Sequence, residues 1–532
     1  MAAAMAPRAI ATPVQPSPAQ PPAPDRPPMT ITPSSPMERL RDYLHTTRLL
    51  GSIHSALYFD QNTVMPAAAA PWRGEQLALL ARQIHQRQSS HAFQDLLAAA
   101  EAEVAAEVEA EDDRRHNLRL LRQELERQRR LDPALVGRLA EAQAHGYARW
   151  QEARARSDFA LFAPALEELV RLRQEQARQL AEPRSCWESL AQVFEPEISH
   201  RRLAELFGPL VERLPPLLER AAGLPPLPPA DWDLPDDAQD LLCQQLLQDW
   251  GYDPGRCVRS RSPHPFSCTI GPADFRITTR VVPGLPFSSF LATAHEWGHS
   301  LYEQGLPRSD DHYFPWPLGE ATSMGVHESQ SLFFECRLAR SAALAERWYP
   351  RFRQALGRDP WGAPRRFWRA LNPMQAGLNR VEADELSYSL HIVLRYELEC
   401  ALLEEGMAVA ELPQRWNDGM ERLLGLRPAH DAEGCLQDVH WSEGLFGYFP
   451  SYALGHLISA QLAEALEAEL GPIEARLSAG DEAAIIAWLG RRVWPLGRRV
   501  NGEELVERLS GRPLEAAPFL RHLEAKLDAL AG

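Results

Sequence analysis

The sequence predicts a mainly α-helical protein with one small β-sheet, and three observations support this prediction. Leucine and alanine recur at helical spacing among Glu, Arg and Gln over residues 37–50, 75–97 and 101–130. The segment 275–282 is instead rich in β-branched residues and lies between two prolines, which is typical of a strand. Hydrophobic residues make up 45% of the chain and charged residues 24%, as in folded, water-soluble proteins.

The chain is expected to consist of a tail and one large folded body. Residues 1–36 are dominated by Pro, Ala, Ser and Thr, a composition that buries too little apolar surface to fold, so we expect a disordered tail there. The body, 37–532, is interrupted by a Pro-rich segment at 224–237. We expect this segment to be a loop between a helical half, up to about 223, and a second half, 238–532, that holds the chemistry.

The charge balance disfavours two classes of partner. With 72 acidic and 56 basic residues the formal charge is −16, and such a surface repels phosphate backbones and anionic lipid headgroups. No apolar run reaches the length of a membrane span, and no signal-peptide pattern is visible. The seven cysteines are scattered and form no CxxC pair. We therefore predict a cytoplasmic protein without nucleic-acid or membrane partners.

The run HEWGH at 295–299 is the clearest sign of chemistry in the sequence. We expect it to lie within one helix that begins after Pro286, with Ser288 or Ser289 as its N-cap, and that ends at Gly305. Residues four apart share one face of a helix, so the two histidines of the run are predicted to bind one Zn²⁺. The glutamate between them lies where a base acting on water would be needed.

The predicted roles within this run are metal ligand for His295 and His299 and general base for Glu296. A catalytic zinc takes a third protein ligand and keeps one position open for water. The run does not continue with the glycine and third histidine of a metzincin. Spacing leaves three glutamates open as the third ligand: Glu320, Glu328 and Glu335. It disfavours Glu303, because that residue shares the helix of the two histidines.

Several short motifs resemble, in order, those of the thermostable carboxypeptidase family of metallopeptidases (carboxypeptidase Taq, family M32). The resemblance extends over nearly the whole chain after the Pro-rich tail, and Asp60, Met65-Pro66 and Arg73-Gly74 resemble the family's opening segment. The six motifs are HPF at 264–266, DFRIT at 274–278, HEWGH at 295–299, HESQ at 327–330, RVEAD at 380–384 and GCLQDVHW at 434–441.

The resemblance implies roles for two residues outside the HEWGH run. It implies that Glu328 is the third zinc ligand and that Arg380 binds the free carboxylate of a peptide, which suits the fork of a guanidinium. Without the resemblance, an ion pair of Arg380 with Glu382 or Asp384 would be the simpler interpretation. The family usually has Ile before this arginine, where this sequence has Asn379.

Five further residues are candidates for the site. Tyr448, Tyr452 and His440 belong to or follow the last motif, and we expect one of them to donate a hydrogen bond to a developing oxyanion, as in related zinc peptidases. His264 and Gln437 lie in shared motifs and are predicted to contact the substrate.

The resemblance also implies a fold and an activity. The fold is a large helical zincin-type body, similar to neurolysin and angiotensin-converting enzyme (ACE), with a deep central groove and the small sheet near the zinc-binding helices. The activity is that of a zinc-dependent metallocarboxypeptidase that removes single C-terminal residues with broad specificity. One Zn²⁺ per chain, replaceable by Co²⁺, and a homodimer are implied as well. Two alternatives remain: an oligopeptidase or dipeptidase on the same scaffold, and a helical scaffold protein that binds metal without catalysis.

Overall fold

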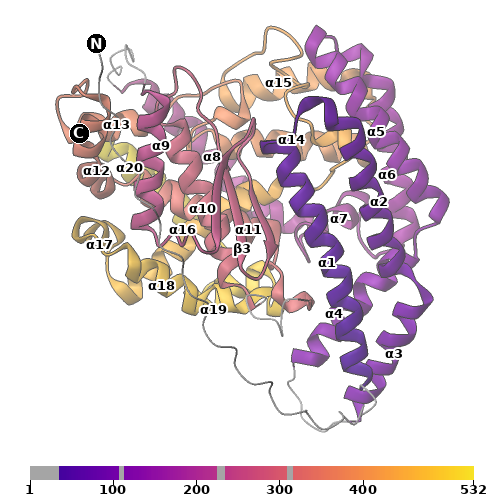
Figure 1. Ribbon diagram of the computed structural model, residues 1–532. Coiled ribbons are helices and arrows are strands. Elements are labelled where there is room, and N and C mark those ends of the chain that lie inside the picture. The colour runs from indigo at the N-terminus through magenta and orange to yellow at the C-terminus, as the bar shows by residue number, and fades with distance from the viewer. Residues whose placement is uncertain (1–34, 107–112, 225–233, 308–314, 532) are drawn as a thin grey trace, which may run out of the picture.

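The predicted helical class is confirmed by the computed structural model, which describes residues 35–106, 113–224, 234–307 and 315–531. Most of the predicted tail and most of the Pro-rich segment lie outside these residues. The α-helices within them, labelled in Figure 1, are α1 (Pro36–Thr63), α2 (Ala70–Ser89), α3 (His91–Ala105), α4 (Asp113–Arg129), α5 (Pro133–Arg156), α6 (Ala163–Leu180), α7 (Cys186–Ala191), α8 (His200–Ala222), α9 (Asp236–Asp249), α10 (Ser288–Gly305), α11 (Met324–Leu332), α12 (Ala342–Leu356), α13 (Pro364–Leu371), α14 (Tyr388–Leu403), α15 (Leu412–Leu424), α16 (Pro450–Leu470), α17 (Ile473–Ala479), α18 (Glu482–Arg492), α19 (Gly502–Ser510) and α20 (Ala517–Ala531).

The N-terminal helices begin at local capping signals. Ser35 and Glu38 form a capping box at the start of α1, and Pro36 occupies the first helical position, where its missing N–H costs nothing. The predicted helical segment 75–97 is divided in the structure between α2 and α3. The division falls at Ser90, whose side chain accepts a hydrogen bond from the Phe93 N–H (3.1 Å) and caps α3.

The sheet has three strands, of which the sequence predicted one. They are β1 (Cys257–Arg261), β2 (Ser267–Gly271) and β3 (Asp274–Thr279), in the order β1-β3-β2, with β1 parallel and β2 antiparallel to β3. The predicted strand 275–282 corresponds to β3 and ends earlier. β1 and β2 were missed because they are short, and charged or small polar residues hide their periodicity.

Helix α10 lies in the middle of the molecule, packed against β3, α9 and α11 (Figure 1). The predicted N-cap is wrong, since the helix begins at Ser288 and its N-cap is Phe287. Both serine hydroxyls are used elsewhere. Ser288 accepts a hydrogen bond from the Val282 N–H (3.3 Å), and Ser289 donates to the side chain of Gln239 (2.6 Å) on α9.

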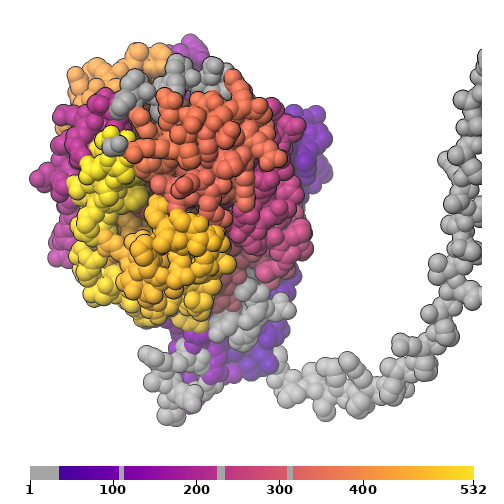
Figure 2. Space-filling view, turned by 90° about the vertical axis from the view of Figure 1, so that its left-hand side faces the viewer, coloured from indigo at the N-terminus to yellow at the C-terminus, as the bar shows by residue number. Residues whose placement is uncertain are grey.

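The buried apolar residues form two main clusters that do not divide at the Pro-rich segment. The larger cluster runs from Trp150 on α5 to Leu530 on α20 and surrounds α10. A smaller one joins α1, α3 and α4 through residues such as Leu97 and Leu121, at the right of Figure 1. On the face shown in Figure 2, the segment of α12 and α13 lies beside the C-terminal helices. None of the described helices has an apolar stretch long enough to cross a bilayer.

Two glycines allow α11, which carries the HESQ motif, to pack closely against α10 and α16. A Cβ on Gly298 of α10 would lie 2.7 Å from the carbonyl oxygen of Gln330 and 2.8 Å from Cα of Ser331, both on α11. A Cβ on Gly455 of α16 would lie 2.9 Å from Cβ of Glu328. These contacts are with backbone or with the base of a side chain, so they leave little room for relaxation.

Gly298→Ala is therefore expected to lower the free energy of unfolding by about 1–3 kcal/mol, the usual cost of overpacking. Gly137→Ala is the matched control, because Gly137 lies exposed inside α5 and an added methyl group there would meet nothing within 4 Å. That control is expected to be neutral or slightly stabilising. Denaturant unfolding of both variants tests the prediction, and equal stability of the two would contradict it.

Candidate metal centre and peptide groove

Three side chains from α10 and α11 converge at one point. Glu328 Oε2 lies 3.8 Å from His295 Nε2 and 3.5 Å from His299 Nε2, and the three ligand atoms lie within 4.8 Å of one another. Ligands about 2.0–2.1 Å from a tetrahedral zinc are about 3.4 Å apart, so the separations suit one ion. Of the three glutamates that spacing left open, Glu328 is the one that meets both histidines.

The other two glutamates have different partners. Glu335 accepts a hydrogen bond from His295 Nδ1 (3.0 Å) and forms an ion pair with Arg340 (2.9 Å). It therefore orients a ligand and does not join the ligand set. Glu320 lies apart from the histidines, in ion pairs with Arg48 and with Arg498 (2.9 Å).

The second histidine is oriented by a chain of hydrogen bonds. His299 Nδ1 lies 2.6 Å from His327 Nδ1, and His327 Nε2 lies 2.8 Å from the carboxylate of Glu303. Both metal-facing imidazoles thus have Nδ1 engaged and Nε2 turned toward Glu328. Sequence reasoning gave His327 no role, although its position directly before Glu328 in the HESQ motif was a signal.

The charges around the ligands favour a bound cation. Burial alone would lower the pKa of His295, but the carboxylates of Glu328, Glu296 and Glu335 raise it to about 10. A proton on His295 compensates part of the negative charge of these carboxylates. A divalent cation at the same place would compensate more of it. Burial lowers the pKa of His299 to about 3, which leaves that imidazole neutral, as a ligand must be. The donor set therefore fits a divalent metal ion.

Glu296 lies beside the ligands without joining them. Its side chain is buried, and burial together with the carboxylates of Glu328 and Glu335 raises its pKa to about 7, against the opposing effect of His295. It shares the α10 turn with both histidines and lines the same groove. A carboxylate there can exchange a proton with a water molecule at the metal position.

A second group of potential ligands differs from the first in its charge. Cys336, Glu385 and His456 also bring their ligand atoms within 4.8 Å of one another. Glu385, however, already forms ion pairs with Lys526 (2.8 Å) and Arg337 (3.5 Å). This group therefore lacks the uncompensated negative charge that distinguishes His295, His299 and Glu328.

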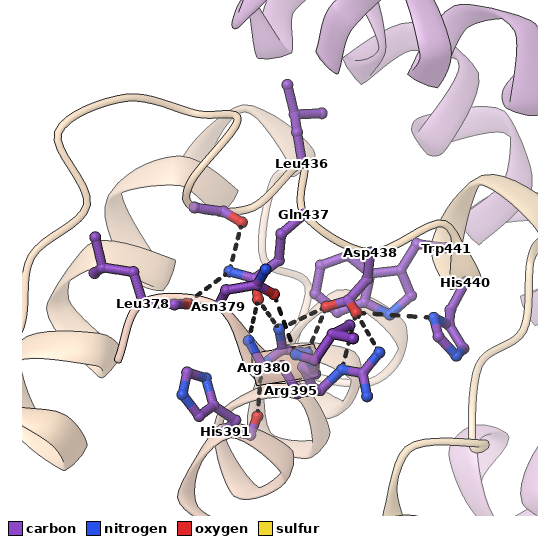
Figure 3. A network of polar contacts seen from close by, with 12 residues as sticks. Leu378, Asn379, Arg380, His391, Arg395, Leu436, Gln437, Asp438, His440 and Trp441 are labelled. Carbon is purple, nitrogen blue, oxygen red and sulfur yellow. Dashed lines mark hydrogen bonds and ion pairs between the residues drawn. The ribbon is translucent and has the colours of Figure 1, made fainter. Parts of the chain in front are cut away.

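Arg380 begins the 3₁₀ turn η6 (Arg380–Glu382), and its partner differs from the two that the sequence suggested. The guanidinium donates to Asp438 (2.9 Å) and to the Tyr388 hydroxyl (3.0 Å), as Figure 3 shows for Asp438. The simpler interpretation, in which Arg380 pairs with Glu382 or Asp384, is therefore wrong. Asp384 is turned toward the start of α14, where it accepts hydrogen bonds from the Ser387 backbone and hydroxyl.

Asp438 is shared by two arginines, so this network carries an excess positive charge. Arg395 donates to its other oxygen (2.6 Å) and is fully buried, whereas Arg380 lines the groove. Burial opposes ionisation of Asp438, but Arg395 and Arg380 hold its pKa far below the usual range. Two guanidiniums and one carboxylate leave one positive charge at the groove wall, where a ligand carboxylate would balance it.

Gln437 contacts Arg380 and Arg395, as Figure 3 shows, and it is not among the residues that line the groove. Its carbonyl accepts hydrogen bonds from the Arg380 N–H (3.0 Å) and from Arg395 (2.8 Å), and its amide donates to the Leu378 carbonyl (3.2 Å). These contacts place Gln437 where it orients Arg380, and its direct contact with substrate stays a prediction. Asn379, at the position of the family's usual Ile, caps η6 by accepting from the backbone N–H two residues later (3.1 Å).

The two tyrosines of the last motif region face the groove, and the histidine lies behind them. Tyr448 and Tyr452 line the groove with ring centroids 5.3 Å apart. Burial raises the pKa of both hydroxyls, so both stay protonated and able to donate. His440 lies 3.3 Å from the Tyr452 hydroxyl, and burial lowers its pKa to about 4. The tyrosines are thus closer to any bound ligand than His440 is.

A buried glutamate that sequence reasoning missed supports this segment. Glu399 on α14 accepts hydrogen bonds from the indole N–H groups of Trp441 (2.9 Å) and Trp187 (2.8 Å) and from the Gly447 N–H (2.9 Å). It therefore fixes the path of the chain just before Tyr448. A single glutamate in a helical stretch gives no sequence signal of burial, because most glutamates are exposed.

His264 lies at the rim of the groove. It is exposed in the loop between β1 and β2, and its neighbours Pro265 and Phe266 line the groove while His264 does not. Phe266 also packs against Phe59 of α1, with centroids 5.8 Å apart. The HPF motif is thus placed to shape the groove wall through its proline and phenylalanine.

The groove that contains these residues has a volume of about 1660 Å³. It runs along α10 past the metal residues, and Arg380 and the two tyrosines also line it. The deep groove and the small sheet near the metal helices, both expected from the family resemblance, are confirmed.

Comparisons with known proteins agree with this geometry. The family described as "Carboxypeptidase Taq (M32) metallopeptidase" matches residues 39–527. Thermostable carboxypeptidase 1 of Thermus thermophilus is 36% identical over 514 residues, which cover 94% of this chain and 100% of that protein. The crystal structure of the M32 carboxypeptidase from Deinococcus radiodurans R1 superposes with a TM-score of 0.89 at 32% identity, covering 93% of this chain and 99% of that one. Trypanosoma cruzi metallocarboxypeptidase 1 gives a TM-score of 0.86 at 32% identity, with 92% and 99% covered.

The contacts of the two non-ligand glutamates predict different effects on metal binding. Glu335→Gln is expected to weaken metal affinity about 10- to 100-fold, because Glu335 orients His295. Glu320→Gln also removes a carboxylate paired with arginine, but it lies apart from the histidines and is expected to leave the affinity unchanged. Competition with a chelator of known affinity measures both, and equal affinities in the two variants would disprove the orienting role of Glu335.

Proposed function

Since the chain belongs to the carboxypeptidase Taq (M32) family of metallopeptidases, and is thus a metallocarboxypeptidase, we propose that it binds Zn²⁺ through His295, His299 and Glu328 and removes single C-terminal residues from peptides. The observation that carries the proposal is the presence, in one groove, of a ligand set that attracts a cation and of Arg380 with an excess positive charge. Imidazole and carboxylate donors with an open fourth position suit catalytic zinc, and Co²⁺ is expected to substitute for it.

Glu296 is proposed as the general base. A divalent cation in this site, when bound, polarises the scissile carbonyl and lowers the pKa of water. Glu296 takes a proton from the attacking water and then delivers it to the leaving amine. Its buried position and raised pKa of about 7 suit a group that must both accept and return a proton near neutral pH.

Arg380 and the tyrosines are proposed to orient the substrate. Arg380 pairs with the terminal carboxylate and so determines which peptide bond lies next to Glu296. The hydroxyls of Tyr448 and Tyr452 donate hydrogen bonds to the developing oxyanion, and His440 supports the second of them. Broad specificity for the released residue is part of this proposal, and the groove volume of about 1660 Å³ leaves room for side chains of different sizes.

Glu296→Gln separates metal binding from catalysis. The variant is expected to keep about one Zn²⁺ per chain while kcat falls by about 10³-fold or more, because the amide cannot accept the proton. Elemental analysis and amino-acid release from a peptide measure the two properties. Turnover at the wild-type rate would refute the base assignment. A wild-type protein that binds zinc but releases nothing from a peptide library would instead favour the non-catalytic scaffold.

Amidation of the peptide's C-terminus tests the role of Arg380. Wild-type protein is expected to cleave the free acid and to lose roughly 10²- to 10³-fold in kcat/KM on the amide, since a buried arginine would face an uncharged group. In Arg380→Gln, kcat/KM on the free acid is expected to fall by a similar factor, while kcat/KM on the amide stays close to the wild-type value. Cleavage of acid and amide at equal rates would favour the oligopeptidase alternative.

The homodimer, the cytoplasmic location and the absence of nucleic-acid and membrane partners stay predictions from the sequence and the family resemblance. Light scattering of the purified protein checks the dimer.

A further inference from the structure

One wall of the groove carries arginines that the proposed mechanism does not use. Arg366 and Arg369 lie three residues apart on α13 and both line the groove, while the apolar face of that helix is buried. Arg358, in the loop before α13, and Arg280, just after β3, line the groove as well. Four guanidiniums from two separate parts of the chain therefore face one groove.

An aromatic cluster fixes these two parts against each other. Phe287, in the loop that follows Arg280, stacks on Trp361 with centroids 6.1 Å apart. The same ring meets Phe367 of α13 edge-on at 5.6 Å. Arg366 directly precedes Phe367, so the cluster ties the chain segments that carry Arg280 and Arg366 into one rigid wall.

Two arginines of this wall have no carboxylate partner in the part of the protein that the structure describes. They are Arg280 and Arg366, which are exposed and form no ion pair there. Asp359, an acidic residue of the same wall, is engaged by the Tyr349 hydroxyl, by Arg353 (3.1 Å) and by the Gly362 N–H (2.9 Å). In a chain of formal charge −16, two such arginines on one substrate groove are a feature that calls for an anionic ligand.

We propose that Arg280 and Arg366 form a subsite for acidic side chains of the peptide, at residues that precede the scissile bond. This inference rests on the proposed function, in which a single residue lies beyond that bond and Arg380 binds its carboxylate. The groove of about 1660 Å³ exceeds the roughly 300–1,000 Å³ of a small-molecule site, so several preceding residues occupy the rest of it. The planar fork of a guanidinium pairs with a side-chain carboxylate in two parallel hydrogen bonds.

The subsite is expected to give a preference, not an absolute requirement. Each exposed ion pair contributes little, so two arginines are expected to favour an acidic residue about 3- to 10-fold over an uncharged one. Because such charges are screened by salt, the preference is expected to shrink at high ionic strength. Broad specificity for the released residue is unaffected, because that residue lies on the other side of the scissile bond.

The test uses metal-loaded protein and three peptides with the same free C-terminal residue and the same length. The peptides carry Glu, Gln or Lys at the positions before the last residue, and kcat/KM is measured from release of the terminal amino acid. Wild-type protein is expected to favour Glu over Gln about 3- to 10-fold and to disfavour Lys.

The double variant Arg280→Gln/Arg366→Gln is expected to cleave the Glu and Gln peptides equally while its kcat/KM on the Gln peptide stays within about two-fold of wild type. Arg365→Gln is the matched control. Arg365 is also an exposed arginine of α13, but it donates to the Ala529 carbonyl (3.0 Å) and does not line the groove. The control is expected to keep the full preference for Glu.

Two results would overturn the inference. One is a wild-type protein that cleaves the Glu and Gln peptides equally at low salt. The other is a double variant whose kcat/KM falls about as much on the Gln peptide as on the Glu peptide, since the arginines would then bind the terminal carboxylate. Peptide affinity measured by calorimetry in the Glu296→Gln variant keeps the two proposals apart: tighter binding of the Glu peptide supports the subsite even if turnover fails, and equal binding contradicts it.

Discussion

The clustering of three carboxylates around two imidazoles is the constraint on which the site depends. Glu296 is buried, and Glu328 and Glu335 are half-buried where they line the groove, so their like charges are only partly screened by water. The positive charge of Arg340 offsets that of the Glu335 carboxylate. The negative charge of Glu296 and Glu328 favours a cation between His295 and His299. The fold around them, from the glycine contacts to the hydrogen bonds at each Nδ1, holds this arrangement in place against its own repulsion.

The groove has an opposite imbalance a short way along its wall. Asp438 neutralises only one of Arg380 and Arg395, and both guanidiniums are buried too deeply for water to compensate the remainder. In the proposed function, the terminal carboxylate of a peptide pairs with Arg380 while its last peptide carbonyl lies at the metal position. The proposed substrate and metal ion would each compensate one of these two charge imbalances.

Buried glutamates also connect the helical segments that flank the site. Glu195 follows α7 and accepts a hydrogen bond from the Gly325 N–H at the start of α11, beside the backbone bond from the Met324 N–H to the Phe194 carbonyl (3.0 Å). Burial raises the pKa of Glu195 to about 7. Glu399 makes the corresponding connection between Trp187 of α7 and the segment before Tyr448. These bonds join α7 and the residues that follow it to α11 and to the segment before Tyr448. The chain before the Pro-rich segment therefore supports the site and is not a separate unit.

The sequence by itself determined the helical class and the α10 motif with its two histidines and Glu296, and the family motifs singled out Glu328 and Arg380 as candidates. The first two features follow from local periodicity and from the spacing of residues on one helix, whereas Glu328 and Arg380 were recognised only through the family resemblance. Only the tertiary structure decided the partners: Asp438 for Arg380, Glu335 and His327 for the ligands, and Glu399 for the tyrosine segment. Each of these contacts joins residues on different elements, and their distances depend on how whole helices pack. Sequence spacing carries no information on that packing, so an acidic residue that is buried and paired looks the same in the sequence as one exposed to water.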